Sequence, residues 1–191
     1  MEINFITSNK VKVDIATEVL DKYGVVPKQQ VFNLKEMQAI DVKEVALDKA
    51  SQAFLLSNKP FIIDDSGLYI STLNNFPGAL LKTVYKAVGD EGLTRLLNGI
   101  KDRSALFINV LVFGDPATKE VKTFLTECHG RMAERASGSR KIGWAIERLF
   151  IPDGHSKPLA QFDDREWETF WVAFKENLHY NKFGKWAKSN L

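Results

Sequence analysis

The chain contains too few cysteines for covalent or metal cross-links. Only one of its 191 residues is a cysteine, Cys128, so an intramolecular disulfide framework is excluded and no cysteine cluster is present for structural zinc. Long apolar runs are missing too. None approaches the roughly 18 residues of a membrane-spanning helix, and residues 1–5 start in a strand-like pattern rather than a signal peptide. We therefore expect a soluble, cytoplasmic protein without a membrane partner.

The chain also lacks a strong net charge. Its formal net charge is +2, which is too small to indicate a nucleic acid or an anionic membrane as partner. A local excess remains near the end, where Lys182, Lys185 and Lys188 follow Asn177 without any acid. This tail suits either an anionic ligand or the solvation of a terminal helix.

A 45% hydrophobic content over this length is enough for one substantial core. There is no internal repeat, low-complexity segment or Pro/Ser-rich linker, so we expect a single domain over 1–191. Strand-like segments 2–7 and 25–34 alternate with helix-like segments 10–23 and 42–57, which predicts an α/β fold.

Later segments modify this picture. Residues 79–88 and 91–97 are predicted to form two helices, and they precede strand-like segments 107–113 and 121–128. A short turn at 114–118 joins these two strands, so they should pair antiparallel. The sheet is therefore expected to be mixed rather than purely parallel.

The apolar stretch 61–70 carries two adjacent acids, Asp64 and Asp65, followed by Ser66 and Gly67. Buried strands rarely contain acids, so the acids are expected where one strand ends and the chain turns. Carboxylates near the interior are unfavourable unless a cation or hydrogen-bond donors neutralise them. A bound metal ion is the simplest neutraliser.

The turn between the first strand and the first helix is suited to anion binding. Thr7, Ser8 and Asn9 lie where the backbone N–H groups and the positive end of the helix dipole meet. Lys12 follows in the first helical turn, where its ammonium group can reach a phosphate. The same residues also fit an ordinary helix N-cap followed by solvated lysines.

The acids and the anion-binding turn are expected to share one edge of the sheet, because ligands of α/β sheets gather at the carboxyl ends of strands. Glu36 and Glu44, before and at the start of the second helix, add carboxylates to this region. Phosphates and carboxylates repel each other unless a divalent cation bridges them. Magnesium is the expected cation, since it uses one or two carboxylates together with phosphate oxygens.

A helix is predicted from residue 164, with Asp163 or Asp164 as its N-cap. Four aromatic residues fall on one face of this helix at i, i+3, i+4 and i+7: Trp167, Phe170, Trp171 and Phe174. Such a stripe fits core packing, a subunit interface or the stacking of a nucleobase.

Three segments together resemble the Ham1-like inosine triphosphate pyrophosphatases, which remove noncanonical purine nucleotides. They are Thr7–Lys12, which corresponds to the family pattern T-G-N-x-x-K, the segment Asp64–Leu68, and Phe76–Lys82. Their order and spacing match as a set. The resemblance implies an elongated mixed β-sheet with flanking helices, two lobes around a central nucleotide-binding cleft, and a homodimer. It also implies magnesium-dependent hydrolysis of ITP, dITP or XTP to the nucleoside monophosphate and pyrophosphate.

The same resemblance implies a role for individual residues. Asp65 would be the catalytic proton acceptor and a metal ligand, Asp64 its supporting acid, and Glu36 the second metal ligand, with Glu44 as the competing candidate. The nucleoside triphosphate substrate would be held by Thr7, Ser8, Asn9, Lys12, Lys49, Ser66 and Lys82.

The segments expected to read the base depart from the family. Trp144 is retained and could stack on a base, but Ala145 replaces an expected acid, for which Glu147 is a candidate substitute. The family's S-H-R near the C-terminus is replaced by residues 180–182, so Asn181 and Lys182 are expected to contact the base. These changes leave two alternatives open: the same chemistry on a different modified or standard nucleotide, or a catalytically weak nucleotide-binding module.

Overall fold

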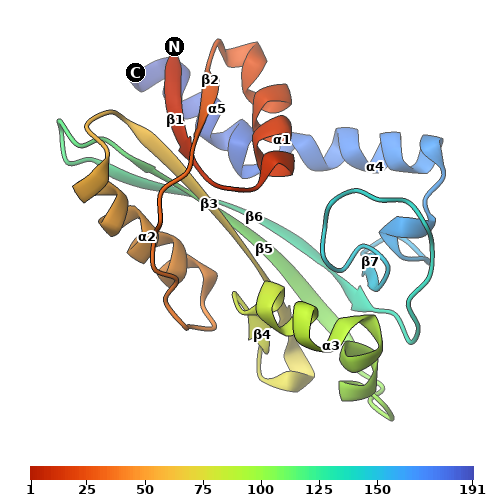
Figure 1. Cartoon of the computed structure of the whole chain (residues 1–191). Helices are drawn as coiled ribbons and strands as arrows, with labels where there is room; N and C mark the ends of the chain where they lie inside the picture. The colour runs from red at the N-terminus through yellow and green to blue at the C-terminus, as the bar shows by residue number, and fades with distance from the viewer.

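A seven-stranded mixed sheet organises the chain, which the computed structural model describes over residues 1–191 (Figure 1). The order across the sheet is β2-β1-β3-β5-β6-β7, with β4 on the side of β3. The strands are β1 (Glu2–Ile6), β2 (Val26–Gln30), β3 (Phe61–Ile70), β4 (Pro77–Gly78), β5 (Ser104–Gly114), β6 (Val121–Met132) and β7 (Phe150–Pro152). Strand β1 pairs parallel with β2 and β3, whereas β3 to β7 pair antiparallel. The prediction of a mixed α/β sheet is confirmed.

Five α-helices flank this sheet: α1 (Lys10–Leu20), α2 (Val42–Leu56), α3 (Leu81–Leu96), α4 (Asp164–Glu176) and α5 (His179–Asn190). Three short 3₁₀ turns accompany them, at Asp21–Tyr23, Ser71–Leu73 and Leu159–Gln161. Helix α3 contains a break at Gly89, whose φ of 62° is not helical, so it corresponds to the two helices predicted there. None of these helices is long and apolar enough to cross a membrane.

Several predicted boundaries lie close to the observed ones. Asp163 is the N-cap of α4 and forms a capping box with Glu166, each side chain bonding the other residue's backbone N–H at 2.8 Å. The strand predicted over 25–34 is shorter, since β2 stops at Gln30 where β1 ends opposite it. The segment from there to α2 is a loop, and it carries Glu36.

The sheet separates two hydrophobic clusters, because successive side chains of a strand point to opposite faces. Ile62, Leu68 and Ile70 of β3 join the larger cluster, which includes residues of α1 and α5. Phe61 and Ile63 join the smaller cluster with the apolar side of α2. In Figure 1, β3, β5 and β6 run through the whole molecule, with α1 and α5 above them and α2 below.

The acids of β3 do not lie at a strand end, so the expectation of a turn at 64–67 is wrong. Strand β5 pairs with β3 at every residue from Phe61 to Ile70 and keeps this segment extended through Ser66 and Gly67. The glycine is needed for close approach instead of for turning. A Cβ at Gly67 would lie 3.0 Å from the carbonyl carbon of Gly78.

What distinguishes the acid-bearing part of β3 is its other edge. Strand β1 pairs with β3 only at Phe61 and Ile62, and β4 pairs with it only at Leu68 and Tyr69. Residues 63–67 are therefore paired on one side only, by β5. This open edge lies directly beyond the carboxyl end of β1, and its residues line the cleft described next.

Candidate active site

A cleft of about 570 Å³ lies along the open edge of β3. The turn after β1, the loop that carries Glu36, the middle of β3 and the first turn of α3 form one end. The 143–145 loop and α4 supply aromatic side chains to the other part of the lining, and the start of α5 contributes His179 and Tyr180, which bond Asp64 of β3. Nearly all the predicted site residues line this one cleft: Thr7, Ser8, Asn9, Lys12, Glu36, Lys49, Asp65, Ser66, Lys82 and Trp144.

The turn before α1 has the geometry of an N-cap. The Asn9 side chain accepts a hydrogen bond from the Val11 N–H at 3.0 Å, and the Thr7 hydroxyl accepts one from the Asn9 N–H at 3.1 Å. Ser8 is exposed beside them. The polar turn thus fixes the start of the helix, and the positive end of α1 faces the cleft.

The two adjacent acids have separate partners because they lie on opposite faces of β3. Asp64 points toward α1 and α5, where Lys12 Nζ lies 2.7 Å from Oδ1 and His179 Nε2 lies 3.0 Å from Oδ2. The Tyr180 hydroxyl donates to the same Oδ2. Burial alone would raise the pKa of Asp64, but Lys12 and His179 hold it well below its ordinary value. Asp64 is therefore a buried carboxylate in its ionised form.

Asp65 points the other way, toward α2. Its Oδ1 lies 2.9 Å from the ammonium of Lys49, while its Oδ2 is buried and has no hydrogen-bond partner within the protein. Burial raises the pKa of Asp65 above its ordinary value, against the opposing effect of Lys12 and Lys49. An unpartnered buried carboxylate oxygen is unfavourable, so this atom is suited to an added cation or donor.

Lys49 also bonds Glu36, with Nζ 2.9 Å from Oε1. This hydrogen bond lowers the pKa of Glu36, whereas the pKa of Lys49 is raised by Asp65 and Glu36 despite the opposing effect of its burial. Glu44, the competing candidate, is exposed on the first turn of α2 and does not line the cleft. The structure thus brings Glu36, and not Glu44, to Asp65.

No group of three or more acid, histidine or cysteine side chains is arranged to hold a metal ion by itself. Two carboxylates, Glu36 and Asp65, share one lysine and leave one buried oxygen free. This donor set fits magnesium, which takes one or two carboxylates and completes its shell with phosphate oxygens and water.

The loop with Glu36 and the segment with Lys82 are held together at Gly78. This residue has a φ of 57°, and a Cβ on it would lie 2.2 Å from the carbonyl oxygen of Ile40. The next N–H, of Ala79, donates to that same oxygen at 2.9 Å. Only glycine fits such an approach, which places Lys82 at the cleft in the first turn of α3.

Ser66 pairs directly across the sheet with Asn109 of β5, and its hydroxyl donates to Asn109 Oδ1 at 2.8 Å. Asn109 lines the cleft and was not predicted. A signal was available, because it is a polar residue in the middle of an otherwise apolar strand.

Aromatic side chains form the far end of the cleft. Trp144 stacks on Phe107, with ring centroids 5.2 Å apart and an angle of 14° between the ring planes. The ring centroid of Phe174 lies 5.6 Å from that of Trp144. Trp171 lines the same end. The stripe on α4 therefore packs against the core, which is one of the three interpretations offered for it, and it also supplies part of the cleft lining.

Glu147 does not take the place of the acid missing at Ala145. Its Oε2 accepts hydrogen bonds from the backbone N–H groups of Ile142 at 2.8 Å and Trp144 at 3.3 Å. It is absent from the lining of the cleft, whereas Ala145 is part of it. The carboxylate thus shapes the loop that presents Trp144.

Asn181 and Lys182 do not reach the cleft, in contrast to the prediction. Asn181 is fully buried, bonded to Tyr23 and to the carbonyl of Glu176, and Lys182 donates to the Leu125 carbonyl at 2.6 Å. Successive residues of a helix differ by about 100° in direction. The first two residues of α5, His179 and Tyr180, are the ones that line the cleft.

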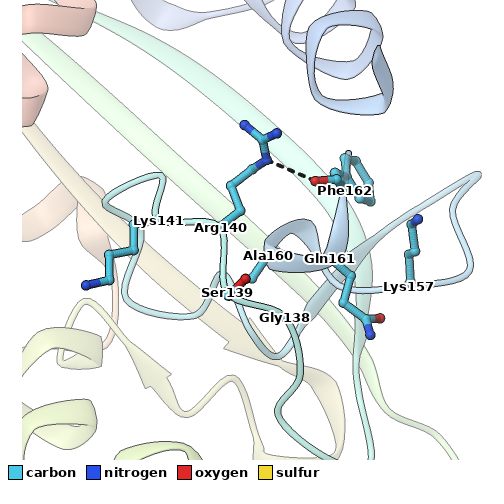
Figure 2. A pocket seen from close by; sticks show the side chains of 8 residues that line it. All are labelled: Gly138, Ser139, Arg140, Lys141, Lys157, Ala160, Gln161 and Phe162. Atoms are coloured by element: carbon cyan, nitrogen blue, oxygen red, sulfur yellow. Dashed lines mark hydrogen bonds between the residues drawn. The ribbon is translucent and has the colours of Figure 1, made fainter. Parts of the chain in front are cut away.

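A second hollow of about 590 Å³ lies at residues 138–162 (Figure 2). Its basic residues do not converge on one point and two of them are already paired, Arg140 with Asp164 and Lys157 with Glu166 at 2.8 Å. No acid lines this hollow. The chemistry-bearing residues are concentrated in the cleft at β3.

The chain matches known proteins over nearly its whole length. A model of the Ham1 family matches residues 3–170. The dITP/XTP pyrophosphatase of Methanopyrus kandleri is 31% identical over 191 residues, covering 100% of this chain and 98% of that protein. The one of Thermococcus kodakarensis is 32% identical, with 100% of both covered.

The fold agrees with this match. The Ham1 protein of Staphylococcus aureus has a TM-score of 0.80 with full coverage of both chains at 22% identity. The resemblance first drawn from the three motifs is confirmed, and the chain belongs to the Ham1 family.

Proposed function

We propose that this protein hydrolyses noncanonical purine nucleoside triphosphates, namely ITP, dITP and XTP, to the nucleoside monophosphate and pyrophosphate. One observation carries the proposal: three lysines and three acids converge beside the N-terminus of α1 in a single cleft that ends in aromatic side chains. The curated relatives cited above are named dITP/XTP pyrophosphatases, which supports the same reaction here.

The polyphosphate would lie at the end of the cleft that holds the lysines. Lys12, Lys49 and Lys82 provide three positive charges, and the first N–H groups of α1 provide donors with a favourable dipole. Phosphoryl transfer depends mainly on charge neutralisation and in-line positioning, so these groups supply most of what the reaction requires.

Glu36 and Asp65 would hold a magnesium ion. When bound there, magnesium would neutralise charge that develops on the phosphate oxygens and would help to orient the attacking water. The free Oδ2 of Asp65 is the atom in this chain best suited to contact it.

Asp65 would also orient the water that attacks the α-phosphorus and accept its proton. A carboxylate with an ordinary pKa is a weak base at neutral pH, and burial moves the pKa of Asp65 in the direction that makes it a better one. Asp64, with both oxygens engaged, would support the site through Lys12.

The nucleobase would lie at the aromatic end, beside Trp144, Trp171 and Phe174. Since Ala145 offers no acid and Glu147 is engaged by the loop backbone, no carboxylate is free to read the base there. This observation favours a second candidate: the same chemistry on a different modified or standard nucleotide.

A nucleotide panel with magnesium tests both candidates. We expect pyrophosphate, and not orthophosphate, to be released, with ITP, dITP and XTP as the fastest substrates. Turnover in H₂¹⁸O should place the label in the monophosphate. Preference for an aminopurine or a pyrimidine would select the second candidate, and release of orthophosphate alone would reject the reaction.

The third possibility, a nucleotide-binding module without efficient catalysis, is tested with Asp65→Asn. Loss of the charge should lower kcat by about 10³-fold, within the usual range for a catalytic acid–base group, while nucleotide binding is retained. Glu36→Gln should raise the magnesium requirement, and Glu44→Gln is the matched control, being exposed and outside the cleft. Equal, negligible turnover in the wild type and in all three variants would support the binding module.

The family resemblance implies the oligomeric state, whereas the cellular location is an expectation from the sequence pattern. We propose a cytoplasmic homodimer, and sedimentation equilibrium of the purified protein measures the first of these two properties.

A further inference from the structure

The first turn of α5 reaches through the core to Asp64. His179 Nε2 lies 3.0 Å from Oδ2, the Tyr180 hydroxyl donates to the same oxygen, and all three side chains are almost fully buried. The sequence had pointed to this segment as a reader of the base. The two residues of this segment that line the cleft, His179 and Tyr180, instead bond Asp64, which lies where the polyphosphate would bind.

The other oxygen of Asp64 is left to Lys12. The lysine ammonium donates to Oδ1 at 2.7 Å and to the backbone carbonyl of Asp64 at 2.9 Å. An ammonium group has three donors, so two are committed to Asp64 and one remains. Since Lys12 lines the cleft, this third donor is available to an anion there.

The His179 ring is itself fixed on both sides. An ionised carboxylate only accepts hydrogen bonds, so Nε2 is the donor to Asp64 and Nδ1 faces the Thr126 hydroxyl at 3.1 Å. Thr126 lies on β6 and its hydroxyl also reaches the Asn177 carbonyl at 3.2 Å. A continuous path of contacts therefore joins β6, α5, β3 and α1.

We propose that His179 and Tyr180 are positioning residues, which fix the plane of the Asp64 carboxylate and thereby aim the Lys12 ammonium at the polyphosphate. Two donors on Oδ2 prevent the carboxylate from rotating and leave Oδ1 to the lysine. If either donor is lost, the carboxylate can turn and Lys12 gains freedom. The role in holding polyphosphate rests on the proposed function, whereas the hold on Lys12 does not.

Tyr180→Phe removes one donor and keeps the ring. Tyr23→Phe is the matched control, because the Tyr23 hydroxyl bonds Asn181 on the same helix without touching Asp64. Acetylation of individual lysines by a succinimidyl ester, followed by mass spectrometry, measures the hold on Lys12 without any substrate. We expect Tyr180→Phe to speed the acetylation of Lys12 about fivefold, in line with the net contribution of one typical hydrogen bond. Lys82, which has no ion-pair partner, is the internal control.

A double-mutant cycle measures the effect on polyphosphate, with inorganic tripolyphosphate and magnesium as the probe. Tyr180→Phe should raise the Kd about fivefold in the wild-type background and less than about twofold in the Lys12→Met background. A merely structural role for Tyr180 would give equal effects in both backgrounds, and that result would overturn the inference.

His179 provides an independent variant. His179→Leu should act like Tyr180→Phe, and His179→Gln, which keeps a side-chain N–H donor, should recover part of the protection of Lys12. Unchanged acetylation of Lys12 in both Tyr180→Phe and His179→Leu would refute the proposal, whatever tripolyphosphate does. A wild-type protein that binds no tripolyphosphate would instead reject the proposed function, and the acetylation rates would still decide the positioning role.

Discussion

Lys49→Met is expected to tighten metal binding in the absence of nucleotide. The lysine ammonium lies 2.9 Å from an oxygen of Glu36 and 2.9 Å from an oxygen of Asp65, the two carboxylates proposed to hold magnesium. A divalent cation must therefore compete with this ammonium for the same oxygens. Methionine approximates the length and apolar character of the lysine stem without the charge.

The size of the change in Kd follows from Coulomb's law, after subtraction of the opposing effects of dehydration and side-chain movement. Two unit charges about 4 Å apart interact by roughly 4 kcal/mol at an effective dielectric constant of about 20. Much of this is balanced because the ammonium is dehydrated at the site and because Glu36 is 57% exposed and can turn to solvent. If about one third remains as competition, the Kd for a divalent cation falls about tenfold.

Lys49→Met should at the same time make the metal-free protein less stable. Lys49 is the only hydrogen-bond partner of Asp65 Oδ1, and Oδ2 has none. Removing the lysine leaves a largely buried carboxylate unpaired, which should lower the free energy of unfolding by about 3 kcal/mol. A divalent cation at about 100 times its Kd should return roughly 2.7 kcal/mol to the variant. The same concentration is about 10 times the Kd of the wild type, which should gain only about 1.4 kcal/mol.

Calorimetric titration with Mn²⁺, followed by thermal unfolding with and without the ion, measures both effects. Lys82→Met is the matched control, since this lysine lies in the same cleft but has no ion-pair partner, and its Kd should change by less than about threefold. Lys49→Arg keeps the charge and should not tighten binding. If Lys49→Met binds Mn²⁺ no better than the wild type, either the lysine does not compete or these carboxylates do not hold the metal.

Three further predictions concern stability and reactivity. Asp64→Asn should destabilise the protein by about 3 kcal/mol near neutral pH. Because the folded pKa of Asp64 is lowered, its contribution is complete above about pH 5 and is lost as the pH falls below about 4 and on through the lowered pKa. Urea titrations should therefore show the gap to the wild type narrowing in acid, and a gap that stays constant to pH 2 would contradict this. Gly78→Ala should cost at least about 3 kcal/mol, since its Cβ would meet the Ile40 oxygen at 2.2 Å, and Gly154→Ala, with nothing within 4 Å, is the control for a positive φ alone. Burial raises the pKa of the Cys128 thiol to about 12, so it should resist iodoacetamide at pH 8 in the native state and react once unfolded.

Much of the fold could be predicted because its signals are local. Apolar periodicity indicated α1 and α2 and the antiparallel pair β5 and β6, and the match to the Ham1 family and its structures confirms the mixed α/β class. The error at residues 64–67 has a physical origin. Ser-Gly after two acids is typical of a turn, but whether it turns depends on the pairing with β5, a strand some 40 residues away that no local pattern reports.

The same division between local and distant signals holds for the candidate site. Thr7 to Lys12 and Asp64 to Ser66 are contiguous segments, and their chemistry could be recognised without knowing what lies opposite. His179 is separated from Asp64 by 115 residues, and its ring is placed by contacts with Thr126 of β6 and Asp64 of β3 that the sequence does not reveal. Asn181 and Lys182 were misplaced because the face of a terminal helix that meets the cleft is set by packing, in which Asn181 is buried against Tyr23.

The alternation of side chains along β3 explains why two adjacent aspartates can have different roles. Asp64 and Asp65 lie on opposite faces, so one meets α1 and α5 while the other meets α2 and the Glu36 loop. Asp64 cannot give up an oxygen without leaving Lys12 or the two α5 donors unpaired in the core, which is costly. Asp65 has an oxygen with no partner at all. A one-residue slip of β3 would exchange the two environments, so the register with β5 decides which acid is free for chemistry. That register is fixed by the apolar residues on both faces, and catalysis at this edge therefore depends on the packing of Ile62, Ile63 and Leu68 as much as on the acids themselves.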